Sequence, residues 1–343
     1  MNNVNPPKEV GLDKLYLHHE KLQSILKMHN DVDFTYPINI ELSFTNKCNL
    51  QCVYCSDRGL RQRQEKNVKQ NKDVLFSLFD DVYQGGTKGI VIEGGGEPCL
   101  HPDFDEIVKF ARKTGLALGL ITNGTQEISN ELLSCFEWIR VSLDASTSEE
   151  YFKLKKVDCF EKVMENIYTY TKHCDTVGVG FVVTNSNTSD IETLVLRLRE
   201  NNVSYIQFRP VVDCDALSVH DLDLSGLLHY QTSSFGIMID GMNENRESGN
   251  YGLPCQCHSL TSVVSADGSV YICGRLNIHN WLKPIGNINN QSFRNIWHGA
   301  ERVHQIEMVR NSEFCKKYCP QCRISKFNKL INELSLMKTK NFI

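Results

Sequence analysis

Six short apolar runs alternate with amphipathic segments between residues 38 and 212, and this alternation constrains the fold more than any other feature of the sequence. The runs are rich in β-branched residues and end at Gly, Asn or charged residues, as is typical of buried parallel strands. They cover residues 38–44, 89–95, 116–122, 138–143, 177–183 and 205–212. Successive β/α units of this kind predict an α/β fold whose parallel sheet forms a partial (β/α)6 TIM-like barrel. Functional side chains are expected just after the strands, at their carboxyl ends.

The rest of the chain predicts smaller units on either side of this barrel. Residues 263–272 (VVSADGSVYI) indicate a β-hairpin, because two β-branched runs flank an Ala-Asp-Gly turn. The predicted units are an N-terminal helical extension (1–36), the partial barrel (37–212), a linker or cover segment (213–254), a small auxiliary domain with the hairpin (255–325), and a C-terminal helix or tail (326–343).

Charge and hydropathy argue against two classes of partner. The chain has 343 residues and a formal net charge of −4. Its pI is near 6.3, so it offers no basic surface for nucleic acid or acidic lipid. No apolar run approaches the ~18–20 residues of a membrane span, and the N-terminus lacks the apolar core of a signal peptide. We therefore expect a cytoplasmic protein with neither a nucleic-acid nor a membrane partner.

Fourteen cysteines are a high number for such a chain, and their grouping indicates metal binding. Disulfides are disfavoured, because there is no secretion signal and the chain is far larger than a disulfide-stapled domain. Nine of the fourteen form two groups. These are Cys48, Cys52 and Cys55 near the start, and Cys255, Cys257, Cys273, Cys315, Cys319 and Cys322 near the end.

The first group comes directly after the first predicted strand. Three thiolates packed this closely can hold three irons of a 4Fe–4S cluster and leave the fourth iron open to a substrate or cofactor. Structural zinc normally takes four ligands, and no fourth Cys or His follows nearby. A plant-type ferredoxin has a first gap of four residues, whereas the gap between Cys48 and Cys52 is three.

The segment CNLQCVYC (48–55) resembles the CxxxCxxC signature of the radical SAM enzymes, and the resemblance extends over roughly residues 38–325. It implies that the open iron binds the amino and carboxylate groups of S-adenosylmethionine. An electron from the cluster then cleaves the sulfonium, and the resulting 5′-deoxyadenosyl radical abstracts hydrogen from a C–H bond. Tyr54 matches the position whose backbone lies beside the adenine.

Further cofactor contacts are expected at the following strand ends. Gly94–Pro98 resembles the GGE(P) motif of this family, in which glycines allow close approach and Glu97 would accept from the methionine ammonium. A tight turn that only closes the strand is the alternative. The predicted cofactor contacts are Tyr54, Gly95, Gly96, Glu97, Asn123, Ser142 and Asn185, while Asp144 is expected only to cap the next helix.

The second group resembles the auxiliary-cluster domain called twitch, the single-cluster form of SPASM. The resemblance implies a second 4Fe–4S cluster, and structural zinc bound by four cysteines is the competing interpretation. The predicted ligands are Cys255, Cys273, Cys319 and Cys322, with Cys257 and Cys315 as alternates.

Three residues at or just after the end of the sixth strand are candidates for the reaction itself. Arg209 would bind an anionic substrate group, and Asp213 would orient a hydroxyl or act as a base. Cys214 would return a hydrogen atom to a substrate radical, which gives an epimerase. Without such a donor, the auxiliary cluster would accept an electron and give a dehydrogenase.

Three functions follow in order of preference. The first is oxidation or epimerisation of a carbinol centre in a sugar, cyclitol or nucleotide-like small molecule, with an electron donor such as flavodoxin or ferredoxin. The second is a maturase that modifies a peptide or protein. It is ranked lower because only 37 residues precede the first strand, and many peptide maturases carry a larger N-terminal module. The third is a two-cluster electron carrier, which the incomplete ligation of the first site disfavours.

Overall fold

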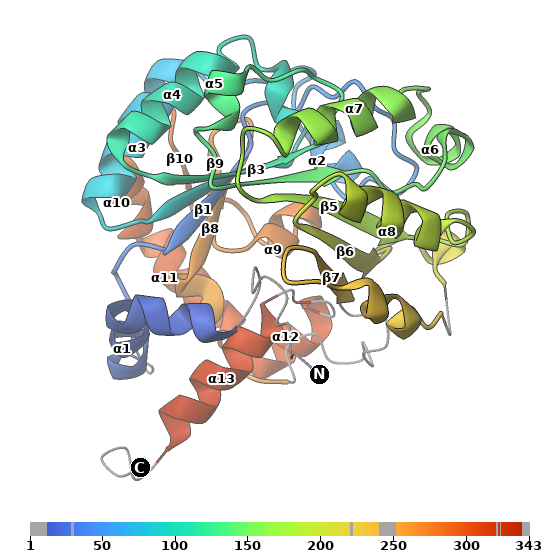
Figure 1. The fold of residues 1–343 in the computed structure, drawn as a ribbon. Coiled ribbons are helices and arrows are strands. Elements are labelled where there is room, and N and C mark those ends of the chain that lie inside the picture. Colours follow the sequence, from blue (N-terminus) through green and yellow to red (C-terminus); the bar gives the residue numbers. More distant parts are fainter. Residues whose placement is uncertain are drawn as a thin grey trace.

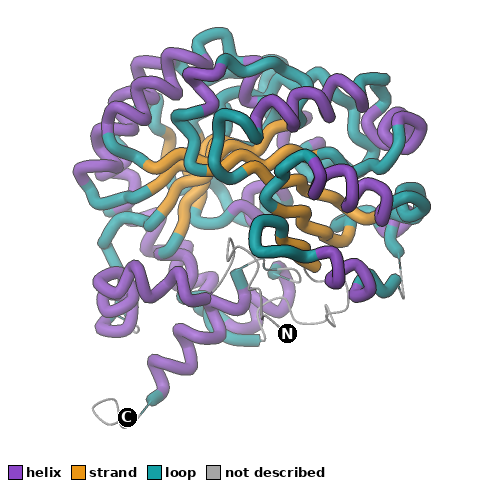
Figure 2. The backbone as a smooth tube through the Cα atoms, viewed as in Figure 1, coloured by secondary structure: helices purple, strands orange, loops and turns teal. Residues whose placement is uncertain are grey.

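One sheet of ten strands organises the molecule (Figures 1 and 2). The computed structural model describes residues 12–28, 31–219, 222–239, 252–319, 322 and 324–337. The strand order is β10-β9-β8-β1-β2-β3-β4-β5-β6-β7. The strands are β1 (Asn39–Leu42), β2 (Gly89–Ile92), β3 (Ala117–Thr122), β4 (Trp138–Ser142), β5 (Val177–Val183), β6 (Tyr205–Pro210), β7 (Gly236–Ile239), β8 (Thr261–Val264), β9 (Ser269–Tyr271) and β10 (Gly286–Asn287).

Strands β8 and β1 to β7 are parallel to one another. At one edge, β9 pairs antiparallel with β8, and β10 pairs antiparallel with β9. The α/β prediction is confirmed, but the sheet is open rather than a TIM-type barrel. The hairpin predicted for a separate auxiliary domain extends this same sheet, because β8 pairs with β1 from Asn39↔Thr261 to Leu42↔Val264. The predicted linker 213–254 contributes β7, and its residues 220, 221 and 240–251 lie outside the described part.

The connecting helices cover one face of the sheet (Figure 1). Side chains that point to this face, such as Ile40, Leu42, Ile90 and Ile92, are at most 1% exposed. The period-2 burial of β1 and β2 therefore places their alternate residues on the other, inner face. The helices are α3 (Lys72–Gln84), α4 (Phe104–Thr114), α5 (Asn130–Leu133), α6 (Ser148–Lys155), α7 (Phe160–Tyr170) and α8 (Ile191–Glu200).

Further helices surround the inner face and the hairpin edge. Helix α9 lies on the side of the sheet opposite to α3–α8 (Figure 1). The remaining helices are η1 (Leu12–His18), α1 (His19–Lys27), α2 (Arg58–Arg63), η2 (Pro98–Leu100), η3 (Asp215–Leu217), η4 (Ser225–Tyr230), η5 (Cys257–Ser259), α9 (Gly274–Ile278), α10 (Phe293–Trp297), α11 (Ala300–Val309), α12 (Ser312–Tyr318) and α13 (Ser325–Leu336).

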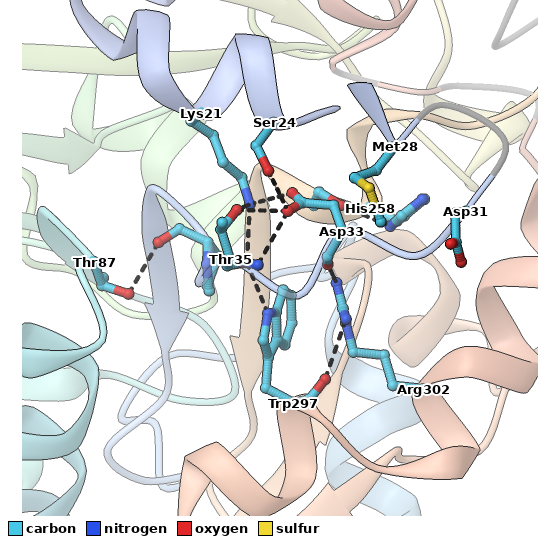
Figure 3. A network of polar contacts seen from close by, with 12 residues as sticks. Lys21, Ser24, Met28, Asp31, Asp33, Thr35, Thr87, His258, Trp297 and Arg302 are labelled. Carbon is cyan, nitrogen blue, oxygen red and sulfur yellow. Dashed lines mark hydrogen bonds and ion pairs between the residues drawn. The ribbon is translucent and has the colours of Figure 1, made fainter. Parts of the chain in front are cut away.

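A buried polar network joins the N-terminal helix to the C-terminal part of the chain (Figure 3). Lys21 on α1 pairs with Asp33 at 2.7 Å, with both side chains buried. Arg302 on α11 donates to the Asp33 carbonyl at 2.9 Å. The indole of Trp297 donates to the Thr35 carbonyl, also at 2.9 Å. The predicted N-terminal extension therefore packs against helices that follow the second cysteine group.

Candidate active site and its two cysteine groups

The first cysteine group lies in the loop after β1, at the carboxyl end of that strand. Cys48, Cys52 and Cys55 are each half-buried and lie close enough to sense one another's charge. Burial raises the pKa of all three thiols, and the charge of Arg61 partly opposes this at Cys48 and Cys55. Arg61 Nη2 donates a 3.5 Å hydrogen bond to Cys55 Sγ. Metal binding deprotonates such thiols, so this donor set fits an iron–sulfur cluster.

Neighbouring elements hold this loop on two sides. The Gln51 N–H donates to the Lys155 carbonyl at 3.1 Å, and the Val53 N–H donates to the Leu154 carbonyl at 2.9 Å. On the other side, Asn123 Nδ2 donates to Asn49 Oδ1 at 2.9 Å. The end of α6 and the loop after β3 therefore fix the position of the cysteines.

A buried ion pair lies beside the loop, and the sequence did not predict it. Lys155, the last residue of α6, pairs with Asp144, and each side chain is 3% exposed. Lys155 Nζ also donates to Ser142 O at 3.2 Å and lies 5.5 Å from the centre of the Tyr54 ring. The other Asp144 oxygen accepts from the Val182 N–H at 2.6 Å. Burial alone would lower the pKa of Lys155, but the negative charge of Asp144 outweighs it and holds that pKa well above its usual value.

The glycine turn after β2 packs against the start of the cysteine loop. Gly94 and Gly95 have φ values of 69° and 62°, in the left-handed region that favours glycine. A Cβ at Gly96 would lie 2.1 Å from the Lys47 carbonyl oxygen. These residues therefore have to be glycine for the loop to pack, whatever they contribute to cofactor binding.

The carboxylate of Glu97 is engaged within the protein. Its oxygens accept from the Thr122 hydroxyl at 2.7 Å, the Asn123 N–H at 2.7 Å and the Cys99 N–H at 3.2 Å. Burial raises the pKa of Glu97, and these hydrogen bonds only partly oppose the shift. Glu97 therefore joins the ends of β2 and β3, and its contact with a methionine ammonium stays a prediction.

The other predicted cofactor residues lie at the same edge of the sheet but in different surroundings. Ser142 ends β4 and is half-buried, whereas Asn185 is exposed. Asn185 Nδ2 donates to the Ala216 carbonyl at 3.0 Å, so it joins the loop after β5 to η3. Two residues further on, Asn187 is fully buried and donates to the carbonyls of Asp144 and Val182, both at 2.8 Å. The sequence contains no signal that distinguishes these two asparagines.

The second cysteine group converges from three segments of the C-terminal part. Cys255 lies close to Cys273, Cys315 and Cys322, and burial followed by their charges raises the pKa of its thiol well above the usual value. Cys319 lies close to Cys255, Cys273 and Cys315. These thiols provide more than the four donors of a fully ligated cubane.

The two alternates have different surroundings. Cys257 is buried in an apolar cluster with Leu15, Ile25 and Ile331, and its thiol also lies close to Cys255, Cys273 and Cys322. Cys315 is also buried and donates to the Val309 carbonyl at 3.0 Å. Cys255 stays the predicted ligand with Cys257 as its alternate, and Cys315 remains an alternate to Cys319 or Cys322.

Iron content distinguishes Cys255 from Cys257 as the ligand of the auxiliary cluster. A Cys255→Ala variant, reconstituted anaerobically, is expected to lose about four irons per chain, because a fully ligated cubane loses an essential thiolate. Cys257→Ala is the matched control and is expected to keep its iron. The reverse result would make Cys257 the ligand.

The two groups lie at opposite ends of strand β1. The first follows β1, whereas Cys255 precedes β8, which is parallel to β1. Cys273 follows β9, which is antiparallel to β8, so it returns to the same end as Cys255. In the described ranges no three Cys, His, Asp or Glu side chains are compact enough to hold a single metal ion. A cubane binds each thiolate through a different iron, so it takes more widely spaced donors.

Helix α9 connects the second group with the loop after β6. Asp213 accepts from Arg275 Nη1 at 2.9 Å and Nη2 at 3.1 Å, and His279 Nε2 lies 3.2 Å from the same carboxylate. Burial alone would raise the pKa of Asp213, but these partners outweigh it and hold that pKa below its usual value. A carboxylate with a lowered pKa is a weak base, so we propose that Asp213 positions α9.

This positioning role predicts a local effect. Asp213 has a φ of 56°, which asparagine also tolerates, so Asp213→Asn removes the charge without straining the backbone. Asp213 is 35% exposed and Arg275 is 14% exposed, so the loss of this partly exposed ion pair is expected to cost about 1 kcal/mol. Amides of α9 should then exchange with deuterium roughly fivefold faster, as measured by mass spectrometry. Unchanged exchange relative to an Asp215→Asn control would contradict the positioning role.

The remaining reaction candidates lie near this loop. Arg209, on β6, lies beside Arg140 of β4 on the inner face. Cys214 is half-buried directly before η3. Its role as a hydrogen donor stays a prediction. Among the described helices, none has the length and apolar character needed to cross a bilayer.

Comparison with known proteins matches both cysteine groups to families. Residues 42–198 match the radical SAM superfamily, and residues 255–323 match the SPASM iron–sulfur cluster-binding domain. The chain is 27% identical to an AdoMet-dependent heme synthase of Methanosarcina barkeri over 84% of this chain and 91% of that protein. It is 21% identical to the mycofactocin maturase MftC of Mycobacterium tuberculosis over 81% of this chain and 75% of that protein.

The fold also resembles solved structures. Streptococcus suis SuiB bound to its precursor peptide SuiA superimposes with a TM-score of 0.64 at 16% identity, over 95% of this chain and 80% of that chain. The radical SAM domain implies a 4Fe–4S cluster with S-adenosylmethionine, and the SPASM domain implies auxiliary iron–sulfur binding. The chain belongs to the radical SAM superfamily and carries a C-terminal SPASM-type iron–sulfur domain.

Proposed function

We propose that this radical SAM enzyme is a maturase that modifies a precursor peptide. The observation that carries the proposal is its similarity to MftC, named a maturase, along 81% of this chain. The fold of SuiB, which binds a precursor peptide, provides further support. These relatives favour the second function predicted from the sequence over the first, a free sugar or cyclitol.

The substrate is expected to enter at the inner face of the sheet. Within the described residues the sheet is open, with β7 and β10 as its edges, so its inner face is not enclosed by strands. Cys48, Cys52 and Cys55 would hold the first cluster, which supplies reducing equivalents to S-adenosylmethionine. The second cysteine group, on the same sheet, would hold the auxiliary cluster.

A second candidate is modification of an iron tetrapyrrole. The similarity to a heme synthase has the higher identity and extends over 91% of that relative. Both candidates are larger than a monosaccharide and both carry carboxylate groups.

The two candidates and the sugar hypothesis can be tested in parallel. Anaerobically reconstituted and reduced full-length enzyme is incubated with S-adenosylmethionine and one of three probes. These are synthetic peptides encoded by short reading frames beside the gene, an iron tetrapyrrole with propionate side chains, and a mixture of free sugars and cyclitols. Mass spectrometry of the probe and the amount of 5′-deoxyadenosine are the measurements.

The expected result is a changed mass in one peptide, with 5′-deoxyadenosine formed above the level without peptide. The enzyme with Cys48 replaced by Ala is the control and should leave the peptide unchanged. Conversion of the tetrapyrrole alone would establish the second candidate. Conversion of a free sugar alone would refute the maturase proposal.

A further inference from the structure

Three glycines on the inner face differ in the reason for their presence. A Cβ at Gly119 would lie 2.2 Å from the Trp138 ring, and one at Gly178 would lie 2.0 Å from the Tyr205 ring. These two glycines make room for aromatic side chains on the next strand. Gly180 has no such neighbour, because a Cβ there would meet its nearest atoms at 3.4 Å and 3.6 Å, ordinary contact distances. Packing therefore does not explain the absence of a side chain at Gly180.

The nearest atoms to a Cβ at Gly180 belong to two arginines. They are Nη2 of Arg209 and Cδ of Arg140. The strand register explains this convergence, because Arg140 is paired with Gly178 on one side of β5, and Gln207 is paired with Gly180 on the other. Two positively charged side chains therefore approach the same position from β4 and β6.

Arg140 is held in place without a compensating negative charge. Its Nη1 donates to Gln207 Oε1 at 2.9 Å, and Gln207 is 6% exposed. Its Nε is buried and has no hydrogen-bond partner among the residues that the structure describes. No carboxylate in that part of the chain forms an ion pair with it. A guanidinium fixed by an amide and next to a second guanidinium is suited to an anion from outside the protein.

The position of the pair relates it to the reaction. Ser142, the predicted cofactor contact, lies two residues beyond Arg140 on the same face of β4. Arg140 therefore lies one step deeper in the sheet than Ser142, whereas Arg209 is paired with Val182, one step nearer the carboxyl ends of the strands. The two side chains converge at Gly180, which is paired with Ser142. The rings of Trp138 and Tyr205 lie on the same face, over Gly119 and Gly178.

We propose that Arg140 and Arg209, with the space above Gly180, form a binding site for a carboxylate of the substrate. The inference rests on the proposed function only in assuming that the substrate enters the inner face. A fork of N–H donors matches the planar carboxylate, and a glycine leaves the space that a methyl group would fill. The substrate class is therefore a carboxylate-bearing molecule whose apolar part contacts the aromatic rings.

The test measures binding and does not require turnover. S-adenosylmethionine-loaded, reconstituted full-length enzyme is titrated calorimetrically with 3-phenylpropionate, its neutral amide and phenyl phosphate. The carboxylate is expected to bind and the amide to bind at least tenfold more weakly. Arg209→Gln and Gly180→Ala are each expected to weaken the carboxylate at least tenfold, and Arg209→Lys less than Arg209→Gln.

Two controls separate binding from folding. Gly226→Ala introduces the same methyl group where nothing lies within 4 Å, so it should bind 3-phenylpropionate like the parent enzyme. Iron content and affinity for S-adenosylmethionine show whether each variant is correctly assembled. The methyl group added by Gly180→Ala would make only ordinary van der Waals contacts. This variant therefore tests the site even if an arginine variant does not fold.

Several outcomes would overturn the proposal. Equal affinity for acid and amide, or no effect of Gly180→Ala and Arg209→Gln, removes the site. Tighter binding of phenyl phosphate assigns it to phosphate. Weakened S-adenosylmethionine binding with unchanged 3-phenylpropionate binding assigns the arginines to the cofactor. If the carboxylate binds as expected but no peptide is modified, the maturase proposal fails while the site stands.

Discussion

A Cys48→Ala variant is expected to contain about four irons per chain instead of about eight, because the first cubane loses one of three thiolates. It should release no 5′-deoxyadenosine above background when reduced with S-adenosylmethionine. Cys48, Cys52 and Cys55 converge in one loop, so the loss of one thiolate removes a ligand of the cluster that cleaves S-adenosylmethionine. Colorimetric iron analysis and chromatography of the nucleoside are the measurements.

Cys135→Ala is the matched control for this experiment. Cys135 is half-buried near the end of α5, and its thiol donates to the Glu131 carbonyl at 3.5 Å. The variant should keep both its iron and its cleavage of S-adenosylmethionine. Full cleavage by Cys48→Ala would show that the first cysteine group is not the cluster site.

A Lys155→Met variant is expected to lose about 3–5 kcal/mol of stability, because it leaves the Asp144 carboxylate buried without its partner. The same change removes the amine that contacts Ser142 and the Tyr54 ring. The first cluster should therefore be lost faster as well. Anaerobic urea unfolding and the decay of the cluster absorbance measure the two effects.

Two further variants isolate the buried pair. Lys153→Met lies on the same helix and breaks an exposed pair with Glu149, so it should leave the free energy of unfolding nearly unchanged. The double variant Asp144→Asn/Lys155→Met removes both charges and should recover part of the loss. A similar loss from Lys153→Met and Lys155→Met would argue against a special role for the buried pair.

The elements that local patterns specify were predicted well. The fifth run, expected at 177–183, is β5 with the same bounds, and the fourth, expected at 138–143, contains β4. Periodicity and short cysteine spacings are local signals, and they were sufficient for the strands and for the first cysteine group.

Features that depend on distant pairing were not predicted. The hairpin was assigned to a separate domain, because nothing local shows that Thr261 pairs with Asn39. The ion pair was missed because Lys155 ends a polar helix and looks like a surface residue until the fold buries it against Asp144. Arg140 was missed for the same reason, since its significance comes from Gly180 and Arg209 on later strands.

The shared sheet also has a consequence for the distance between the two iron–sulfur groups. Cys48 follows β1, and Cys255 and Cys273 lie beyond the other end of the adjoining strands. Hydrogen-bonded strands do not stretch, so no hinge between separate bodies can bring these redox centres together or move them apart. Clusters bound at the two groups would therefore exchange electrons across a separation that the sheet keeps constant.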